Sequence, residues 1–294
     1  MCRKLNLPVL FVLASVLCLA WGVVVQADVS KPAGFWNFEG NATNSGKGGN
    51  TEWEEADKEV HVADSAAQEK EGSITLDTDP HLVGWWKFDD TSGNTAVDSS
   101  KHRHNGTLKG DLSFDKSSVP GKIERALKLG GGEDYVQIAK YKGVAGTQPR
   151  TVAAWVKTTA STGQIVSWGA DDYGKMWIFG FIRGRIGVTP NGGYLYINDA
   201  VHDDEWHHVA AVVEKADLPN LHDDVKLYKD GTQAEIHDIG LLDLWPIDTG
   251  SDMDVTIGRR FKGLLDDVRI YDRPLVEDEI NALFMLQSNR PLPK

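Results

Sequence analysis

Short apolar or alternating stretches recur from about residue 81 to residue 271, and turn residues separate them. Three-glycine, Asn-Gly-Gly and Asp-Gly turns occur at 130–132, 191–193 and 230–231, and Asp-Gly after a strand is a strong hairpin signal. The pattern predicts strands at residues 151–157, 164–168, 176–182, 194–197, 205–213, 225–228, 255–257 and 264–271. Many short strands with tight turns are typical of a sandwich or a barrel.

One segment near the C-terminal end has helical spacing instead. Ile280, Leu283, Phe284 and Leu286 recur at roughly helical intervals within residues 276–287, and three acids occupy the first turn. Carboxylates at that end interact favourably with the helix dipole. The pattern therefore predicts an all-β domain with one short C-terminal helix.

Alternation along strands also assigns faces to the large aromatic residues. Adjacent residues on a strand point to opposite sides, and residues two apart share a side. Trp85 and Trp86 should therefore enter different layers, whereas Trp177 and Phe179 should be buried together. His207 and His208 should also diverge, so they cannot jointly ligate one ion, and one is expected to pack beside a core Trp206.

Residues 1–27 have the character of an export signal. Arg3 and Lys4 precede an apolar run from Val9 to Val25, and a small-residue cleavage site ends at Ala27. The alternative is an uncleaved membrane anchor, because the apolar run is long. Both cysteines fall within this segment, so a cleaved chain has no disulfide, which favours a bacterial source. We expect the protein to be secreted, periplasmic or on the cell surface, with no membrane span after cleavage.

Residues 28–80 are polar and mixed in charge, and they are predicted to be a linker or lead-in. Within them, GFWNFEG at 34–40 resembles GWWKFDD at 84–90. Two interpretations stay open: a chance likeness of two aromatic strands, or a truncated repeat of the first strand of the main domain. The main domain is placed at 81–288 and a tail at 289–294.

The charge narrows the class of ligand. The chain has 31 basic and 43 acidic residues and a formal charge of −12. Nucleic-acid binding needs clustered Lys and Arg, so this composition argues against it and favours neutral ligands or cations.

Several motifs, in a fixed order, resemble the LamG-like jelly-roll family within the concanavalin A-like lectin/glucanase superfamily. They are WWKFDDTSGNTAVDS at 85–99, ALKLGGGEDYV at 126–136, TVAAWV at 151–156, DEWHHVA at 204–210, VKLYKDG at 225–231 and FKGLLDDVRIY at 261–271. The resemblance covers residues 82–287 and implies two packed antiparallel sheets, the jelly-roll sandwich. It says nothing of residues 28–80, and a fold does not fix a function.

The sequence predicts no catalytic residues. Retaining glucanases of this superfamily need two carboxyl groups about 5 Å apart on one face of a strand. The pair of acids that comes nearest to this arrangement is Glu235 and Asp238, but their spacing puts them on opposite faces of a strand. Motifs of serine hydrolases, zinc proteases and phosphate-binding loops are also missing from the sequence. We therefore expect a binding module, with a polysaccharide hydrolase as the third choice.

Acidic pairs suggest a calcium site instead. Asp89, Asp90 and Asp98 flank a turn that contains Asn94, and Asp266 begins a motif of the last strand. Ca²⁺ takes six to eight oxygen ligands from carboxylates and loop carbonyls, and LamG-like domains often carry it at a comparable place. The alternative is that Asp98 caps a turn while Asp266 and its neighbour pair with arginines.

Two loop aromatics, Tyr173 and Trp245, are the candidate ligand-binding residues. Exposed rings of this kind stack on sugars, although they can also anchor a loop. The sequence thus predicts calcium-dependent recognition of a polysaccharide, glycoconjugate or other cell-surface ligand. The alternative is an extracellular structural or adhesion protein that binds protein partners.

Overall fold

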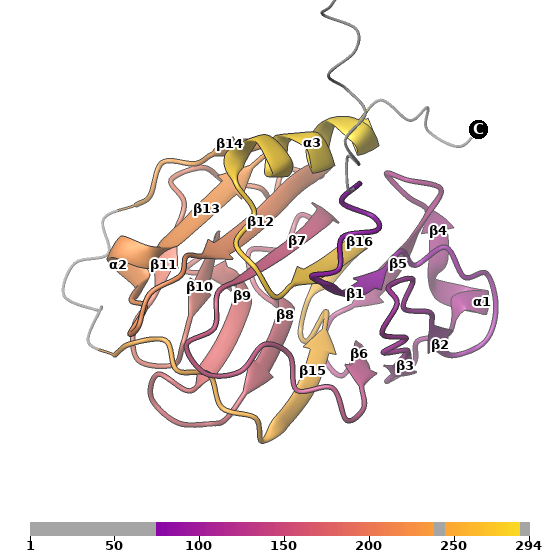
Figure 1. Cartoon of the computed structure of the whole chain (residues 1–294). Coiled ribbons are helices and arrows are strands. Elements are labelled where there is room, and N and C mark those ends of the chain that lie inside the picture. Colours follow the sequence, from indigo (N-terminus) through magenta and orange to yellow (C-terminus); the bar gives the residue numbers. More distant parts are fainter. Residues whose placement is uncertain (1–74, 238–244, 289–294) are drawn as a thin grey trace, which may run out of the picture. The chain divides into compact units, whose positions relative to one another are not determined.

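The computed structural model describes residues 75–237 and 245–288. The predicted leader 1–27, nearly all of the predicted lead-in 28–80 and the tail 289–294 lie outside the described residues. Within the described part the chain forms two antiparallel eight-stranded sheets packed face to face, the predicted jelly-roll sandwich (Figure 1). No helix in the described ranges has the length and apolar character that crossing a bilayer requires.

Sheet A has the order β14-β13-β12-β7-β16-β5-β4, and β1 also pairs with β16. Its strands are β1 (Leu82–Trp86), β4 (Ser118–Pro120), β5 (Arg125–Gly130), β7 (Arg150–Lys157), β12 (His207–Val213), β13 (Val225–Lys229), β14 (Thr232–Gln233) and β16 (Lys262–Tyr271). The long strand β16 pairs with β7 along one edge, while β5 and β1 share its other edge. Strands from both ends of the domain therefore meet on β16.

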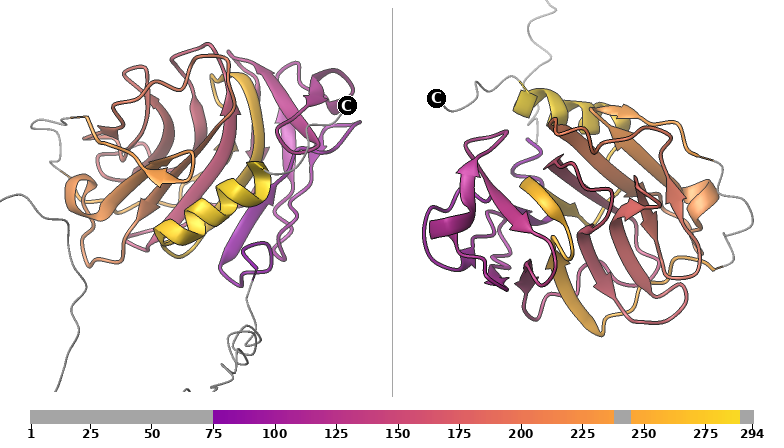
Figure 2. Two further views of the ribbon diagram at one scale, coloured as in Figure 1. Left: turned by 90° about the horizontal axis from the view of Figure 1, so that it is seen from above. Right: turned by 180° about the vertical axis from the view of Figure 1, so that it is seen from behind.

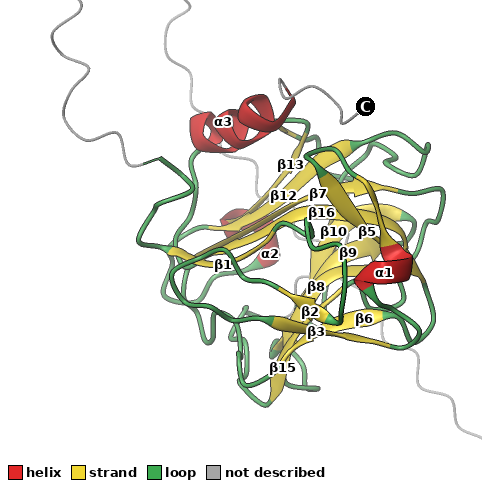
Figure 3. Cartoon of the chain, turned by 90° about the vertical axis from the view of Figure 1, so that its right-hand side faces the viewer, coloured by secondary structure: helices red, strands yellow, loops and turns green. Residues whose placement is uncertain are grey.

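Sheet B has the order β11-β10-β9-β8-β15-β6-β3-β2. Its strands are β2 (Thr95–Ala96), β3 (Gly106–Lys109), β6 (Tyr135–Ile138), β8 (Gln164–Gly169), β9 (Met176–Ile182), β10 (Arg185–Thr189), β11 (Leu195–Tyr196) and β15 (Met253–Ile257). The two sheets and α3 form successive layers in the side view (Figure 3).

The predicted C-terminal helix is α3 (Glu277–Ser288), one residue displaced from the expected 276–287. It lies across the outer face of sheet A (Figure 2). Two single-turn helices, α1 (Phe114–Ser117) and α2 (Leu221–Asp224), were not predicted. The side chain of Asn220 accepts hydrogen bonds from the His222 and Asp223 backbone amides in α2, the usual role of an N-cap asparagine.

The adjacent residues Trp85 and Trp86 are buried in two separate cores, as strand alternation predicted. Trp86 is fully buried between the sheets with Trp177 and Phe179, whereas Trp85 lies in the layer between sheet A and α3. Burying each such side chain contributes roughly 1.5–3 kcal/mol relative to exposure. The expectation for Trp206 was wrong, because it is only half-buried and immediately precedes β12.

The hairpin between β13 and β14 has the predicted two-residue turn. Asp230 and Gly231 have φ angles of 51° and 83°, as in the I′ turn whose twist matches paired strands. A Cβ on Gly231 would lie 2.9 Å from the Phe284 ring of α3. Glycine therefore allows both the turn and the close approach of α3.

Residues 75–80, the end of the predicted lead-in, pack against β16. Leu76 is buried and its carbonyl accepts a hydrogen bond from the Tyr271 hydroxyl at 3.2 Å. Asp77 lies 2.6 Å from Arg269, and Asp79 accepts a hydrogen bond from Arg273 at 2.9 Å. The described domain thus includes at least six residues ahead of the predicted boundary at 81.

Candidate functional site

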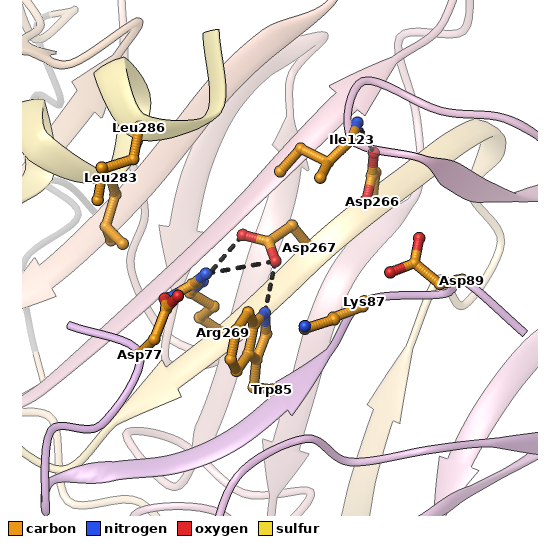
Figure 4. A pocket seen from close by; sticks show the side chains of 10 residues that line it. All are labelled: Asp77, Trp85, Lys87, Asp89, Ile123, Asp266, Asp267, Arg269, Leu283 and Leu286. Atoms are coloured by element: carbon orange, nitrogen blue, oxygen red, sulfur yellow. Dashed lines mark hydrogen bonds and ion pairs between the residues drawn. The ribbon is translucent and has the colours of Figure 1, made fainter. Parts of the chain in front are cut away.

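An acidic pocket opens where β1, β16, the 121–123 turn and α3 meet, with a volume of about 60 Å³ (Figure 4). It is lined by Asp77, Trp85, Lys87, Asp89, Ile123, Asp266, Asp267, Arg269, Leu283 and Leu286. The charged residues of this pocket form two groups. One group is paired internally, whereas the other is only partly satisfied and can accept a ligand.

The first group is internally paired. Asp267 accepts hydrogen bonds from Arg269 at 2.8 Å and from the indole N–H of Trp85. The Trp85 ring lies between two cations, with Lys87 at 4.3 Å and Arg269 at 4.0 Å from its centroid. Burial acts to lower the pKa of Arg269, but Asp267, Tyr271 and Asp77 together outweigh burial and hold that pKa above its usual value. These groups are occupied in holding β1 and β16 together.

The second group is Asp89 and Asp266, whose carboxylates are only partly satisfied. Asp266 is fully buried, and one of its oxygens accepts the Ile123 backbone N–H at 2.8 Å. Its Oδ1 is buried without a hydrogen-bond partner among the described residues. Asp89 accepts the Arg125 backbone N–H at 3.0 Å. An unsatisfied buried oxygen costs free energy, so Asp266 Oδ1 is suited to a cation or a bound proton.

Burial raises the pKa of both carboxyls, and repulsion adds to it. Loss of solvation, chiefly, raises the pKa of Asp266 well above its usual range, and Asp267 and Asp89 contribute. Desolvation likewise raises the pKa of Asp89 to about 6. A divalent cation at this place would relieve the repulsion.

Asp98 has a different environment from the one predicted. It is fully buried, and its two oxygens accept four hydrogen bonds, from the Trp85, Ser100 and His104 amides and the Ser100 hydroxyl, at 2.7–2.9 Å. Its bond to Ser100 is the turn-capping arrangement of the alternative interpretation. Asp98 has little capacity left for a metal ion.

The structure brings together two of the five predicted calcium ligands. Asp89 and Asp266 line the acidic pocket, whereas Asp90, Asn94 and Asp98 are not among its lining residues. The Asp90 carboxylate accepts the Val97 amide at 3.2 Å. Across the described ranges no three His, Cys, Asp or Glu side chains are grouped to hold a metal ion.

The two predicted ligand-binding aromatics form a stacked pair, here called the aromatic pair. The rings of Tyr173 and Trp245 have centroids 5.6 Å apart and planes 13° apart. Their exposed fractions are 60% and 47%. The sequence identified each residue but not their contact, because 72 positions separate them.

Three loops support the aromatic pair. The Gly174 amide donates to the Asn191 carbonyl and the Asp248 amide to the Gly174 carbonyl, each at 2.9 Å. A Cβ on Gly192 would lie 2.7 Å from the Trp245 ring, so that glycine lets the turn pass beneath the indole. The exposed rings therefore rest on a hydrogen-bonded base.

The two adjacent histidines have structural surroundings. His207 lies between Asp230 at 2.8 Å and Asp203 at 3.1 Å, and these partners raise its pKa. His208 is buried against Trp155 and Phe284, and desolvation lowers its pKa to about 4. The two side chains therefore diverge, as strand alternation predicted.

The fold and these sites are those of a two-sheet jelly-roll domain with loop-borne aromatics. A family profile described as the concanavalin A-like lectin/glucanases superfamily matches residues 130–281. The match spans just over half of the chain, and the chain belongs to that superfamily, as its motifs indicated.

Solved structures with similar folds include domain 4 of AbnA, a GH43 extracellular arabinanase from Geobacillus stearothermophilus, in complex with arabinotriose. It is 21% identical, with a TM-score of 0.51, over 69% of this chain and 97% of that domain. The botulinum neurotoxin serotype G binding domain is 15% identical, with a TM-score of 0.45, over 71% of this chain and 51% of that one. At these identities the likeness concerns the fold. No curated protein sequence in the comparison matches the chain.

Proposed function

We propose that this chain is an exported, non-catalytic binding module that recognises glycans or glycan-bearing surfaces through the aromatic pair. The observation that carries the proposal is the exposure of Tyr173 and Trp245. They are the two aromatic side chains among the exposed large hydrophobic residues of the described part. A stacked and supported pair of open rings offers the flat apolar surface on which a sugar ring packs.

The arabinanase domain supports this choice, since a protein of the same fold was solved with arabinotriose. The predicted leader at 1–27 supports export, which N-terminal sequencing of secreted material would test. A protein-binding adhesion role is the second candidate, because exposed Trp and Tyr are also common anchors of protein interfaces.

Binding of oligosaccharides to the full chain tests the proposal. A glycan array followed by titration calorimetry with the best neutral ligand should show saturable binding. Tyr173→Ala and Trp245→Ala should each weaken it at least tenfold, the loss typical of a central anchor. Leu218→Ala is the matched control, because Leu218 is 68% exposed and lies outside the pair. Equal losses in all three variants would contradict the proposal.

A blank glycan array with retained attachment to cells would instead favour the protein-binding alternative. Hydrolysis of a polysaccharide that is abolished by Asp89→Asn would favour the third candidate, a hydrolase, since a carboxyl with a pKa of about 6 can act as an acid.

We also propose that the acidic pocket binds Ca²⁺ through Asp89 and Asp266. The support is Asp266 Oδ1, a buried oxygen that no described donor satisfies. Two carboxylates fall short of the six to eight oxygens that Ca²⁺ takes, so backbone carbonyls and water would complete the site. This site is separate from the aromatic pair, and its role is to stabilise the junction of β1 and β16.

A further inference from the structure

A groove on the outer face of sheet A carries an unusual group of lysines. Its volume is about 420 Å³, within the size range of ligand sites. Most of its lining residues come from β4, β5, β16 and β7, which are neighbours in sheet A (Figure 1). It is lined by Val119, Pro120, Lys128, Leu129, Gly130, Lys157, Thr158, Thr159, Asp204, Lys262, Gly263 and Leu264. We call it the lysine groove.

The strand register places the lysines around an apolar floor. Leu264 of β16 is directly opposite Lys128 of β5 on one side and Lys157 of β7 on the other. Directly opposed residues have Cβ atoms about 4.5–5.5 Å apart, so the two lysines flank Leu264. Lys262 lies two residues before Leu264 and so shares its face. Three lysines therefore border one half-buried leucine.

These lysines form no ion pair with any described residue, although acids are abundant in the chain. Elsewhere Lys142 pairs with Asp254, Lys226 with Glu214 and Lys229 with Asp199, at 2.7–3.2 Å. Among the residues that line the lysine groove, Asp204 is the one acid. The groove is thus a local excess of positive charge on a protein whose formal charge is −12.

We infer that the lysine groove binds a sugar unit that carries a carboxylate or sulfate group. The apolar floor of Leu264, Val119 and Pro120 suits the C–H face of a pyranose ring. The three ammonium groups suit its anionic substituent, and the exposed Thr159 offers a hydroxyl for ring oxygens. This site goes beyond the proposed function, because it shares no residue with the aromatic pair and selects a charged ligand.

Three labelled polymers test the inference on the full chain: polygalacturonate, dextran sulfate and neutral dextran. Binding should be measured by thermophoresis at low and at moderate NaCl. At least one polyanion should bind, neutral dextran should not compete for it, and added salt should weaken it, because the contacts are between charges. The preferred polyanion tells whether carboxylate or sulfate is the recognised group.

Two triple variants separate the groove from general charge. Lys128→Gln/Lys157→Gln/Lys262→Gln should weaken polyanion binding at least tenfold. Lys142→Gln/Lys226→Gln/Lys229→Gln removes the same charge elsewhere and should weaken it less than threefold. Equal losses in both, or no polyanion binding by the unmodified chain, would overturn the inference. Equally tight binding of poly-glutamate would overturn the assignment to a sugar.

Binding of neutral oligosaccharides to the aromatic pair should be the same in both triple variants. The glycan proposal for Tyr173 and Trp245 therefore stands or falls separately from the lysine groove.

Discussion

One half of the outer face of sheet A is covered by α3 and the other half is open. Among the described residues, charged side chains are paired in the covered half and unpaired in the open half. Under and beside α3, Arg269 and Asp267 are each about 4% exposed and are paired with each other. In the open half Lys128 and Lys262 are exposed and have no acidic partner among the described residues. The same strand β16 contributes to both halves.

Desolvation explains this contrast. A charge taken out of water costs several kcal/mol unless a partner compensates it, whereas water solvates an exposed ammonium group without help. Pairing in the covered half is therefore a requirement of folding. Lack of pairing in the open half costs little and leaves the charges available to a ligand. Asp266 is the exception, because it is buried and only half satisfied.

The largest effect is expected from breaking the covered ion pair. Asp267→Asn removes the buried carboxylate partner of the Arg269 guanidinium, leaves it only the more exposed Asp77, and weakens the bond from Trp85. We expect the free energy of unfolding to fall by about 3–5 kcal/mol, measured by urea denaturation. Asp272→Asn is the control, because its pair with His81 is about half exposed and should be worth less than about 1 kcal/mol. Similar losses in both variants would refute the role of burial.

The second effect is a pH dependence that comes from His208 under α3. Its pKa is about 4 in the folded chain against an ordinary value of 6.5. Between these values the unfolded chain binds more protons, so the free energy of unfolding should fall as pH decreases from about 7 to 4. The loss should approach about 3 kcal/mol.

A comparison with His208→Leu isolates this contribution. His207 acts in the opposite direction, because its acidic partners raise its pKa, and it is present in both proteins. The difference in unfolding free energy between the two proteins should therefore change with pH by the amount expected of His208. Parallel pH curves would contradict a buried neutral histidine.

The third effect concerns Asp266, the buried and only half-satisfied carboxylate. If Ca²⁺ binds the folded chain alone, a hundredfold excess over Kd should stabilise it by about 2.7 kcal/mol, and Mg²⁺ by less. The response should be smaller at pH 5 than at pH 7.5, because the pKa of Asp89 is about 6 and its protonated form is a poor ligand. Asp266→Asn should blunt the response, whereas Asp98→Asn should not. A melting temperature unaffected by Ca²⁺ and by EDTA would remove the metal proposal.

The sequence predicted what depends on local periodicity. Spacing alone predicted the Asp230-Gly231 hairpin, α3, the opposite faces of Trp85 and Trp86, and strands β7, β8, β9, β11, β12, β13, β15 and β16. Strands β3, β5, β6 and β10 were not among the predicted ones, and in β10 the glycine-interrupted sequence at 185–189 gives a weak alternation signal.

Contacts between distant segments could not be predicted in this way. The sequence proposed Asp98 and Asp266 as partners, but tertiary structure places Asp98 among four donor groups of Trp85, Ser100 and His104 and Asp266 beside the 121–123 turn. Nor does spacing reveal that Lys128 and Lys157 flank Leu264, because that depends on the register of three strands. Site residues were recognisable by type, whereas their grouping needed the fold.

The smallest effect is expected in the open half, and it completes the comparison. Lys128→Gln, Lys157→Gln and Lys262→Gln remove two exposed charges and one half-buried charge that lack a described partner. Surface substitutions of this kind usually change stability by less than about 0.5 kcal/mol each. The three lysines repel one another, which destabilises the fold, and they are attracted to the net negative chain, which stabilises it. Because these effects oppose each other, the free energy of unfolding of the triple variant should lie within about 1 kcal/mol of that of the unmodified chain. Urea denaturation checks this, and Asp267→Asn serves as the contrasting variant. A loss in the triple variant as large as that of Asp267→Asn would mean that these lysines hold the sheet together, and the open half would then resemble the covered one.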